Sequence, residues 1–320
     1  RLSVELARAS RAQWVRGAAR WLPKLREALD LRTTSPGEVA YVLEPDLKLG
    51  RGGMRDAHVL RWLEIAHPGL IGRDQEIYDA AYTQLLEARV ALHRRTGRRG
   101  DLLLLQEQDA VAADLGFADA DVFMAAVANA ARTVEWLTDD AFDRVSVTSG
   151  WLRRRPRERP LGEGILLRDG QVHVGEVVPE GVAGCALLLD AALAAVGNDL
   201  RLARDTLERF SAAPLTFPNP WPVELRDRFV ALLSAGPAAI PVLELIDHWG
   251  LLARAIPEWA PCRSRPQRNA YHRYTVDRHL LETAVNAASL VGRVERGDLL
   301  IMGGLLHDIG KGYPPREHTE

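Results

Sequence analysis

The residue types best suited to chemistry stand near the C-terminal end of the sequence, where two histidines and an aspartate are spaced to meet. His307 and Asp308 are adjacent and follow the apolar stretch 299–302. His279 lies upstream of them, near the start of the preceding predicted helix. If the two helices that carry them form an antiparallel hairpin turning at 292–297, His279 and His307 each lie roughly 20 Å from the turn at a rise of about 1.5 Å per residue. Two imidazoles and a carboxylate would then converge as a ligand set for a divalent cation.

These residues also have an ordinary interpretation. A histidine near the start of a helix is usually a surface or capping residue, and an isolated His-Asp pair is unremarkable. Here, however, the pair is preceded by Gly-Gly-Leu-Leu and followed by Ile-Gly-Lys. In such an apolar setting an unpartnered charge costs free energy to bury. The setting and the balanced spacing together favour metal binding by the complete domain.

A second pattern, LEPDLKLGRGGMRDAHVLRW at 43–62, places a glycine-rich turn between a predicted short strand and a predicted helix. Glycines let backbone N–H groups approach a ligand, and a helix N-terminus attracts phosphate. The candidate phosphate-binding residues are Lys48, Arg51, Gly52, Gly53 and Arg55. A positive φ is expected at Gly53. Because the spacing is that of neither a P-loop nor a dinucleotide fold, the alternative is a tight structural turn before a helix that an aspartate caps.

The elements that position these residues are mostly helical. Helical periodicity predicts helices over 2–29, 54–66, 75–96, 107–115, 119–138, 181–195, 199–211, 222–234, 238–249, 276–292 and 298–309. A short strand is predicted over 39–43, and Asp169-Gly170 predicts a small β-hairpin between 165–167 and 172–174. Basic and proline-containing segments predict linkers at 150–160 and 256–270. The predicted fold class is mainly α, with helical bundles, a short strand and a small hairpin.

Composition limits the classes of partner and compartment. The hydrophobic share of 47% and charged share of 26% are typical of globular protein, and the net charge of −2 gives no field for nucleic acid or an anionic membrane. Cys185 and Cys262 are far apart, which favours a reducing cytoplasm over a disulfide scaffold. The apolar stretch 181–197 contains Asp190 and is shorter than the roughly 20 residues of a membrane span, so it predicts a buried helix. The N-terminus has no signal-peptide pattern and no initiator Met, so we expect the chain to begin inside a longer protein.

The C-terminal pattern resembles the HD superfamily of metal-dependent phosphohydrolases, whose signature is a His, then His-Asp, then a distant Asp. The resemblance implies that His279, His307 and Asp308 bind a divalent metal, Mg or Mn, that activates water and neutralises phosphate charge. The last ligand would lie beyond Glu320. Residues 266–320 would therefore be only the first part of the HD domain, which would continue outside this sequence.

The same resemblance assigns roles to three further residues. Lys311 is similar to the basic residue that follows the signature, and His318 to a histidine in the loop beyond it. Both are candidate catalytic residues, as contacts to phosphate, to a second metal or to substrate. His272 matches a family pattern outside the metal signature and is a candidate substrate-binding residue.

The glycine-rich string resembles the signature shared by PII uridylyltransferases and glutamine synthetase adenylyltransferases, just after their nucleotidyltransferase core. Only the former continue into an HD domain, and Pro257-Glu258-Trp259 with YHRYTVDRH resembles the way they do so. The resemblance implies an enzyme that attaches a nucleotide to a tyrosine of the PII signalling protein, hydrolyses it off again and so controls nitrogen assimilation. The implied substrates are UTP or ATP and nucleotidylylated PII, and glutamine is implied as effector through domains missing here.

The resemblance also predicts how the chain is organised. Residues 1–149 would form a helical domain after the transferase core, 150–265 a connecting region, and 266–320 the first part of the HD domain. The Gly-Ser loop and paired acidic residues of the transferase would precede Arg1, and ligand-sensing ACT repeats would follow the HD domain, so this fragment alone is expected to be inactive. A glutamine synthetase adenylyltransferase-like protein and a non-catalytic helical regulatory fragment are the alternatives, and the His-Asp-Ile-Gly-Lys string argues against both. The nucleotide stays open between UTP and ATP.

Overall fold

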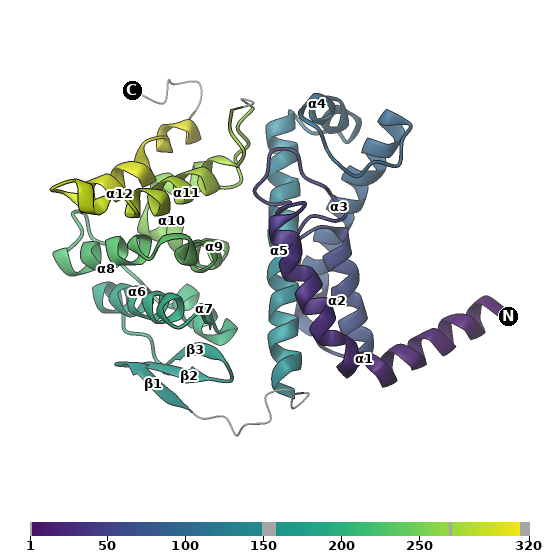
Figure 1. Cartoon of the computed structure of the whole chain (residues 1–320), viewed down its shortest axis with the longest axis horizontal. Helices are drawn as coiled ribbons and strands as arrows, with labels where there is room; N and C mark the ends of the chain where they lie inside the picture. The colour runs from purple at the N-terminus through teal and green to yellow at the C-terminus, as the bar shows by residue number, and fades with distance from the viewer. Residues whose placement is uncertain (1, 149–157, 269–270, 314–320) are drawn as a thin grey trace. The chain divides into compact units, whose positions relative to one another are not determined.

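The computed structural model describes residues 2–148, 158–268 and 271–313, and these are mainly helical, as the sequence predicts (Figure 1). By its internal contacts the chain divides into two units, of which unit 1 holds residues 1–152 and 266–275, and unit 2 holds 153–265 and 276–320. Most of the linker predicted at 150–160 lies outside the described residues.

Unit 1 is a bundle of helices around one long buried helix. Its helices are α1 (Leu2–Thr34), α2 (Met54–Ala66), α3 (Gln75–Thr96), α4 (Leu105–Asp114) and α5 (Ala120–Thr148), with a 3₁₀ turn η1 (Gly72–Asp74). The predictions for α2 and α3 are correct to the residue. Helix α5 packs against α2, α3 and α4, and most of its residues are buried or half-buried.

Helix α5 ends at Thr148, ten residues after the end of the predicted 119–138. Its prediction stopped at Asp139-Asp140, a charged pair that is unfavourable in an apolar helix. Both aspartates are nevertheless buried, and Asp139 accepts hydrogen bonds from Arg26 and Arg51. Ion pairs with residues distant in sequence therefore carry the helix past the point where composition indicates its end.

The short strand predicted over 39–43 is wrong. The segment instead forms turns with two isolated bridges, Glu38 to Arg51 and Val42 to Tyr274. The consecutive residues Val39, Ala40 and Tyr41 are all buried, so side chains on both faces of this segment are covered. A short apolar run does not by its periodicity distinguish a strand from a buried turn.

The sheet of unit 2 contains β1 (Arg159–Gly162), β2 (Ile165–Arg168), β3 (Gln171–Val174) and β4 (Arg201–Leu202) in that order. The first three strands are antiparallel and β4 pairs with β3 in parallel. Asp169 and Gly170 have φ values of 52° and 80°, as the tight turn of the predicted hairpin requires. The hairpin is confirmed, whereas the start of the helix predicted over 199–211 is occupied by β4.

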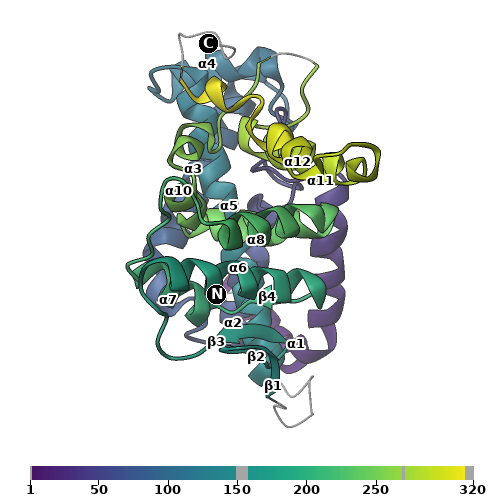
Figure 2. The same cartoon turned by 90° about the vertical axis from the view of Figure 1, so that its left-hand side faces the viewer.

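The helices of unit 2 follow the sheet in successive layers (Figure 2). They are α6 (Gly181–Gly197), α7 (Arg204–Ala212), α8 (Val223–Ser234), α9 (Ala239–His248), α10 (Leu251–Ala255), α11 (Val276–Ala288) and α12 (Gly297–Leu306), with 3₁₀ turns η2 (Gly236–Ala238), η3 (Pro257–Cys262), η4 (Val291–Arg293) and η5 (Ile309–Gly312). Helix α6 is the buried helix predicted at 181–197, and its Asp190 pairs with Arg228 at 2.8 Å.

The linker predicted at 256–270 contains part of the core of unit 2. Trp259 in η3 is 1% exposed, and its indole Nε1 donates to Asp247 Oδ1 at 2.9 Å. The three prolines that suggested a linker therefore accompany a packed 3₁₀ turn. Among the described residues no single helix has the length and apolar composition of a membrane span, although the bent pair Val223–Ser234 and Gly236–His248 meets both criteria jointly with a bend of 108°.

Candidate metal centre and glycine loop

Helices α11 and α12 form the hairpin that the spacing predicts, and they bring His279, His307 and Asp308 together. The two Nε2 atoms of the histidines lie 3.2 Å apart. The Oδ2 atom of Asp308 lies 3.5 Å from Nε2 of His279 and 3.3 Å from Nε2 of His307. One ligand atom from each residue thus lies within 4.8 Å of the others.

Close packing of the two helices sets this convergence. Helix α11 buries Leu280 and Ala284 and leaves His279 partly exposed on its other side. A Cβ on Gly304 of α12 would lie 3.2 Å from the carbonyl oxygen of Thr283 on α11, so a larger residue there would push the helices apart. This glycine, which was not singled out from the sequence, allows the close approach one turn before His307.

Hydrogen bonds fix the orientation of the site. Nδ1 of His307 lies 2.8 Å from the carbonyl oxygen of Gly304, so it carries the proton and leaves the Nε2 lone pair for a ligand. Lys311 donates from Nζ to Asp308 Oδ2 at 2.6 Å. Burial acts to raise the pKa of Asp308, but the bond from Lys311 and the nearby positive charges outweigh it and lower that pKa. The carboxyl is therefore held ionised and ready to accept a cation.

The three residues fit a divalent cation. Ligand atoms at about 2.0–2.2 Å from one metal are separated from each other by roughly 3.0–3.5 Å in tetrahedral or octahedral geometry. The observed separations of 3.2, 3.3 and 3.5 Å match this range. Two imidazoles and one carboxylate are also a mixed nitrogen and oxygen donor set that divalent metals accept.

The other residues proposed for the hydrolase site are placed differently. We call His279, His307 and Asp308 the metal group, meaning the residues that could hold a metal. Lys311 contacts this group through Asp308. His272 is half-buried in the segment 266–275, which belongs to unit 1, whereas the metal group belongs to unit 2. His318 lies outside the described residues.

Arg51 of the glycine loop is buried among carboxylates. Its guanidinium bonds to Asp56 at 2.7 Å and to Asp139 at 2.5 Å, and Glu135 lies 3.5 Å away. Burial alone would lower the pKa of Arg51, but the charges of Asp139, Glu135 and Asp56 raise it. Arg32 donates a further bond to Asp56. Arg51 is thus the centre of a buried ionic cluster that the sequence analysis missed.

The backbone N–H groups of the glycine loop all have internal acceptors. Those of Lys48 and Leu49 bond to Asp46 Oδ1, and that of Gly52 bonds to Asp56 Oδ2. The remaining amides between Leu47 and Arg55 bond to backbone carbonyls. This arrangement supports the tight structural turn that the sequence left as the alternative to a phosphate loop.

The glycines serve packing, and the positive φ falls at Gly52 (79°), one residue before the position expected. A Cβ there would lie 2.6 Å from the carbonyl oxygen of Ala131 on α5. Gly53 has a φ of −82°, and its need is steric, because a Cβ would lie 2.8 Å from the carbonyl oxygen of Gly50. The loop therefore lies flat against α5.

Three alanine substitutions separate the two reasons why a position needs glycine, a positive φ and a lack of space for a Cβ. Gly52→Ala combines a positive φ with a clash, Gly53→Ala adds a clash alone, and Gly69→Ala adds only a positive φ (88°) in open space. We expect Gly69→Ala to destabilise by about 1 kcal/mol and Gly52→Ala by at least about 3 kcal/mol, with Gly53→Ala between them. Urea unfolding followed by circular dichroism measures the order. Equal effects of Gly52→Ala and Gly69→Ala would contradict the close packing of the loop.

Lys48 and Arg55 lie at a basic surface of unit 1. Asp101 gathers three basic groups, Arg89 at 2.6 Å, His93 at 2.9 Å and Lys48 at 3.6 Å. The pKa of His58 is lowered by burial and then by the surrounding cations, of which Arg55 contributes most. One carboxylate faces several cations here, so the surface suits an anion.

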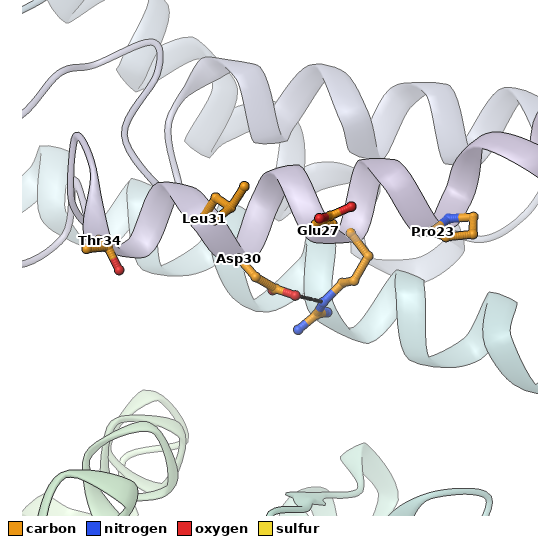
Figure 3. A pocket seen from close by; sticks show the side chains of 6 residues that line it. Pro23, Glu27, Asp30, Leu31 and Thr34 are labelled. Carbon is orange, nitrogen blue, oxygen red and sulfur yellow. Dashed lines mark hydrogen bonds and ion pairs between the residues drawn. The ribbon is translucent and has the colours of Figure 1, made fainter.

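A hollow of about 530 Å³ runs along α1 (Figure 3). Its lining residues are Pro23, Arg26, Glu27, Asp30, Leu31 and Thr34. Arg26 is already paired with Asp30 at 3.0 Å and with Asp139 at 2.9 Å, so its charge is balanced within unit 1. We assign no function to this hollow.

Comparison with known proteins places both motifs in one family. The family model described as GlnD PII-uridylyltransferase matches residues 23–142, and the HD domain model matches residues 276–320. A bifunctional uridylyltransferase/uridylyl-removing enzyme of Streptomyces coelicolor is 42% identical over 98% of this chain. This chain belongs to the PII-uridylyltransferase/uridylyl-removing enzyme family. Enzymes of the same description from Mycobacterium tuberculosis and Corynebacterium glutamicum are 40% and 34% identical over 97% and 89% of the chain.

The chain spans about 40% of the length of these curated relatives, with shares of 39%, 40% and 40%. No solved structure matches the chain. The family assignment confirms the resemblance drawn from the glycine-rich string and the HD pattern, and the HD match begins at α11, which carries the first of the three clustered residues.

Proposed function

We propose that the full-length protein attaches a nucleotide to a tyrosine of the PII signalling protein and removes it by hydrolysis, and that the α11–α12 hairpin belongs to the removal site. The observation that carries the removal site is the group of His279, His307 and Asp308, whose ligand atoms lie within 4.8 Å of one another. We propose that these residues hold a divalent metal, Mg or Mn. When bound, such a metal lowers the pKa of its water and polarises a phosphoryl oxygen.

The residues around the metal group would orient the substrate. The carbonyl oxygen of Gly304 accepts a hydrogen bond from Nδ1 of His307, which keeps Nε2 of His307 available. Lys311 holds Asp308 through a bond of 2.6 Å, and its ammonium is suited to contact a phosphodiester oxygen once the carboxylate is engaged elsewhere. We propose His318 as a further contact to metal or substrate, and His272 as a substrate contact. The nucleotidylylated tyrosine of PII would be the substrate.

For attachment, we propose that Lys48 and Arg55 face the nucleotide, while Arg51, Gly52 and Gly53 hold the loop against α5. The internal bonds of the loop amides and the ionic cluster around Arg51 support this division. We further propose that the protein works in the cytoplasm, that 1–149 follows a transferase core, that 150–265 connects it to the HD domain beginning in 266–320, and that glutamine acts through other domains.

The nucleotide is identified by mass. PII is incubated with the full-length enzyme and either UTP or ATP, and its intact mass is measured before and after a chase without nucleotide. We expect a uridylyl or adenylyl increment, about 306 or 329 Da, since transfer leaves one nucleoside monophosphate on the tyrosine oxygen. The increment should disappear during the chase when a divalent metal is present. An unmodified PII with both nucleotides would overturn the proposed attachment activity.

A further inference from the structure

The ten residues before α11, of which the structure describes 266–268 and 271–275, are here called the strap (266–275). The strap belongs to unit 1, although the chain on both sides of it belongs to unit 2. Its two ends are fastened together in unit 2, because Val276 N donates to the carbonyl oxygen of Arg265 at 2.8 Å. A second bond, from Ser264 N to Asp277 Oδ2 at 2.8 Å, joins the same two stretches. The chain therefore leaves unit 2 after Arg265 and returns to it at Val276, and these two residues are bonded to each other.

Within unit 1 the backbone of the strap is paired with the segment that precedes the glycine loop. Thr275 N donates to the carbonyl oxygen of Tyr41 at 2.8 Å, and Leu43 N donates to that of Arg273 at 3.3 Å. An antiparallel bridge between Val42 and Tyr274 lies between these two bonds. The end of the strap is thus held over three consecutive residues of unit 1.

A charged anchor holds the other half of the strap. Arg268 donates from Nε to Asp121 at 2.7 Å and from Nη1 to both oxygens of Asp109 at 2.9 and 3.1 Å. The guanidinium therefore joins α4, which carries Asp109, to the first turn of α5, which carries Asp121. Two acceptors on two helices fix the strap more closely than one exposed ion pair would.

The segment that receives the strap also receives the glycine loop. Arg51 donates its backbone N–H to Gly37, and its carbonyl oxygen accepts from Val39, both at 2.9 Å. Tyr41, two residues later, is buried, and its ring lies 4.7 Å from the guanidinium carbon of Arg132. Residues 37–43 are therefore a buried piece of chain with the glycine loop bonded at one end and the strap at the other.

The residue that follows the strap most closely among the three clustered ones is His279. Helix α11 begins at Val276, directly after Thr275, and His279 lies in its first turn. We propose that the strap positions His279 and thereby couples the transferase-side unit to the metal centre, so that nucleotide bound beside the glycine loop changes the affinity of the HD site for its metal. This inference rests on the proposed function. By linkage the metal must change the affinity for nucleotide by the same factor.

The test measures that coupling in the full-length enzyme. Mn²⁺ is titrated calorimetrically with and without a saturating non-hydrolysable UTP or ATP analogue, whichever matches the nucleotide that PII accepts. For the wild type we expect the Kd for Mn²⁺ to shift by about fivefold or more between the two conditions, the lower end of measured couplings. In Arg268→Ala the shift should vanish while removal at saturating metal and attachment both persist. Arg268→Lys should restore part of the shift.

Two controls keep the result specific. Arg296→Ala removes an arginine that pairs with Asp298, two residues later in the first turn of α12, and this variant should keep the full shift. Asp121→Ala breaks the shortest bond of the anchor from the other side and should reduce the shift even where Arg268→Ala fails to fold. Faster hydrogen exchange at the amides of Leu43 and Thr275 in both anchor variants would report release of the strap.

The outcomes separate the inference from the proposed function. A wild type without a shift, or anchor variants that fold and keep the whole shift, overturns the strap as a coupling element. A full-length enzyme that neither binds Mn²⁺ at the HD site nor removes nucleotide from PII overturns the proposed function instead. A shift lost in the anchor variants and kept in Arg296→Ala supports the inference.

Discussion

The double substitution His307→Ala and Asp308→Asn in the full-length enzyme is expected to stop nucleotide removal and leave attachment intact. Of the three clustered ligands only His279 would remain, and Lys311 would lose the carboxylate that it holds at 2.6 Å. Even mutations of groups that only orient metal ligands cost about 10–100-fold in affinity or activity, so removal should fall by more than about 100-fold. Attachment should persist, because its chemistry is proposed for a separate domain.

Both activities are measured on the same preparation, attachment by the rise in PII mass and removal by its fall, and metal content by elemental analysis. Asp298→Asn is the matched control, since this carboxylate also lies on α12 but is half-exposed and pairs with Arg296 at 2.6 Å. It should leave metal content and removal unchanged. Equal loss of both activities with retained helicity would contradict the separation, and unchanged metal content in the double variant would remove His307 and Asp308 from the ligand set.

The meeting of His279, His307 and Asp308 was predictable because it depends on local rules. Helical periodicity defines the two helices, and the rise per residue places His279 and His307 level with each other across the turn. The only long-range assumption is that the hairpin is antiparallel, which a short connection between helices favours. The close approach at Gly304 refines this geometry without changing which residues meet.

The glycine loop was less predictable because its partners are remote in sequence. Arg51 meets Asp139, 88 residues later, and nothing in the spacing of either residue signals the other. A basic residue in a glycine-rich turn has the same local pattern whether it faces a phosphate or a buried carboxylate. The aspartates inside the apolar helix α5 were the available signal, since a buried charge requires a partner.

The strap was hidden from sequence for a related reason. Composition indicated a proline-containing linker over 256–270, yet the chain packs η3 into unit 2 and gives 266–275 to unit 1. The anchoring bonds join Thr275 to Tyr41 and Arg268 to Asp109 and Asp121, more than 140 residues away in each case. Such pairings follow from the tertiary fold, which periodicity alone does not provide.

Replacing Arg51 with Met is expected to cost about 3–5 kcal/mol of the free energy of unfolding of unit 1, the usual result of removing one partner from a buried ion pair. Methionine keeps most of the volume but leaves Asp56, Asp139 and Glu135 without the charge that they surround. Chemical denaturation followed by circular dichroism measures the loss. The control is Arg61→Met on α2, an exposed arginine 5.2 Å from the ring of Tyr82, which should cost no more than about 1 kcal/mol.

The size of the Arg51→Met effect should also depend on pH. Burial raises the pKa of Glu135 to about 7 even though Arg51 acts to lower it, so removing Arg51 raises that pKa further. A carboxyl whose pKa is higher in the folded than in the unfolded state binds more protons when folded, so its folded state loses stability as pH rises from the unfolded pKa through the folded one. In the wild type this loss stops near the folded pKa of about 7, whereas in Arg51→Met it continues to higher pH. The deficit of Arg51→Met relative to wild type should therefore grow as the pH rises above about 7. A deficit independent of pH would mean that methionine fails in packing, and that the carboxylates around Arg51 do not need its charge.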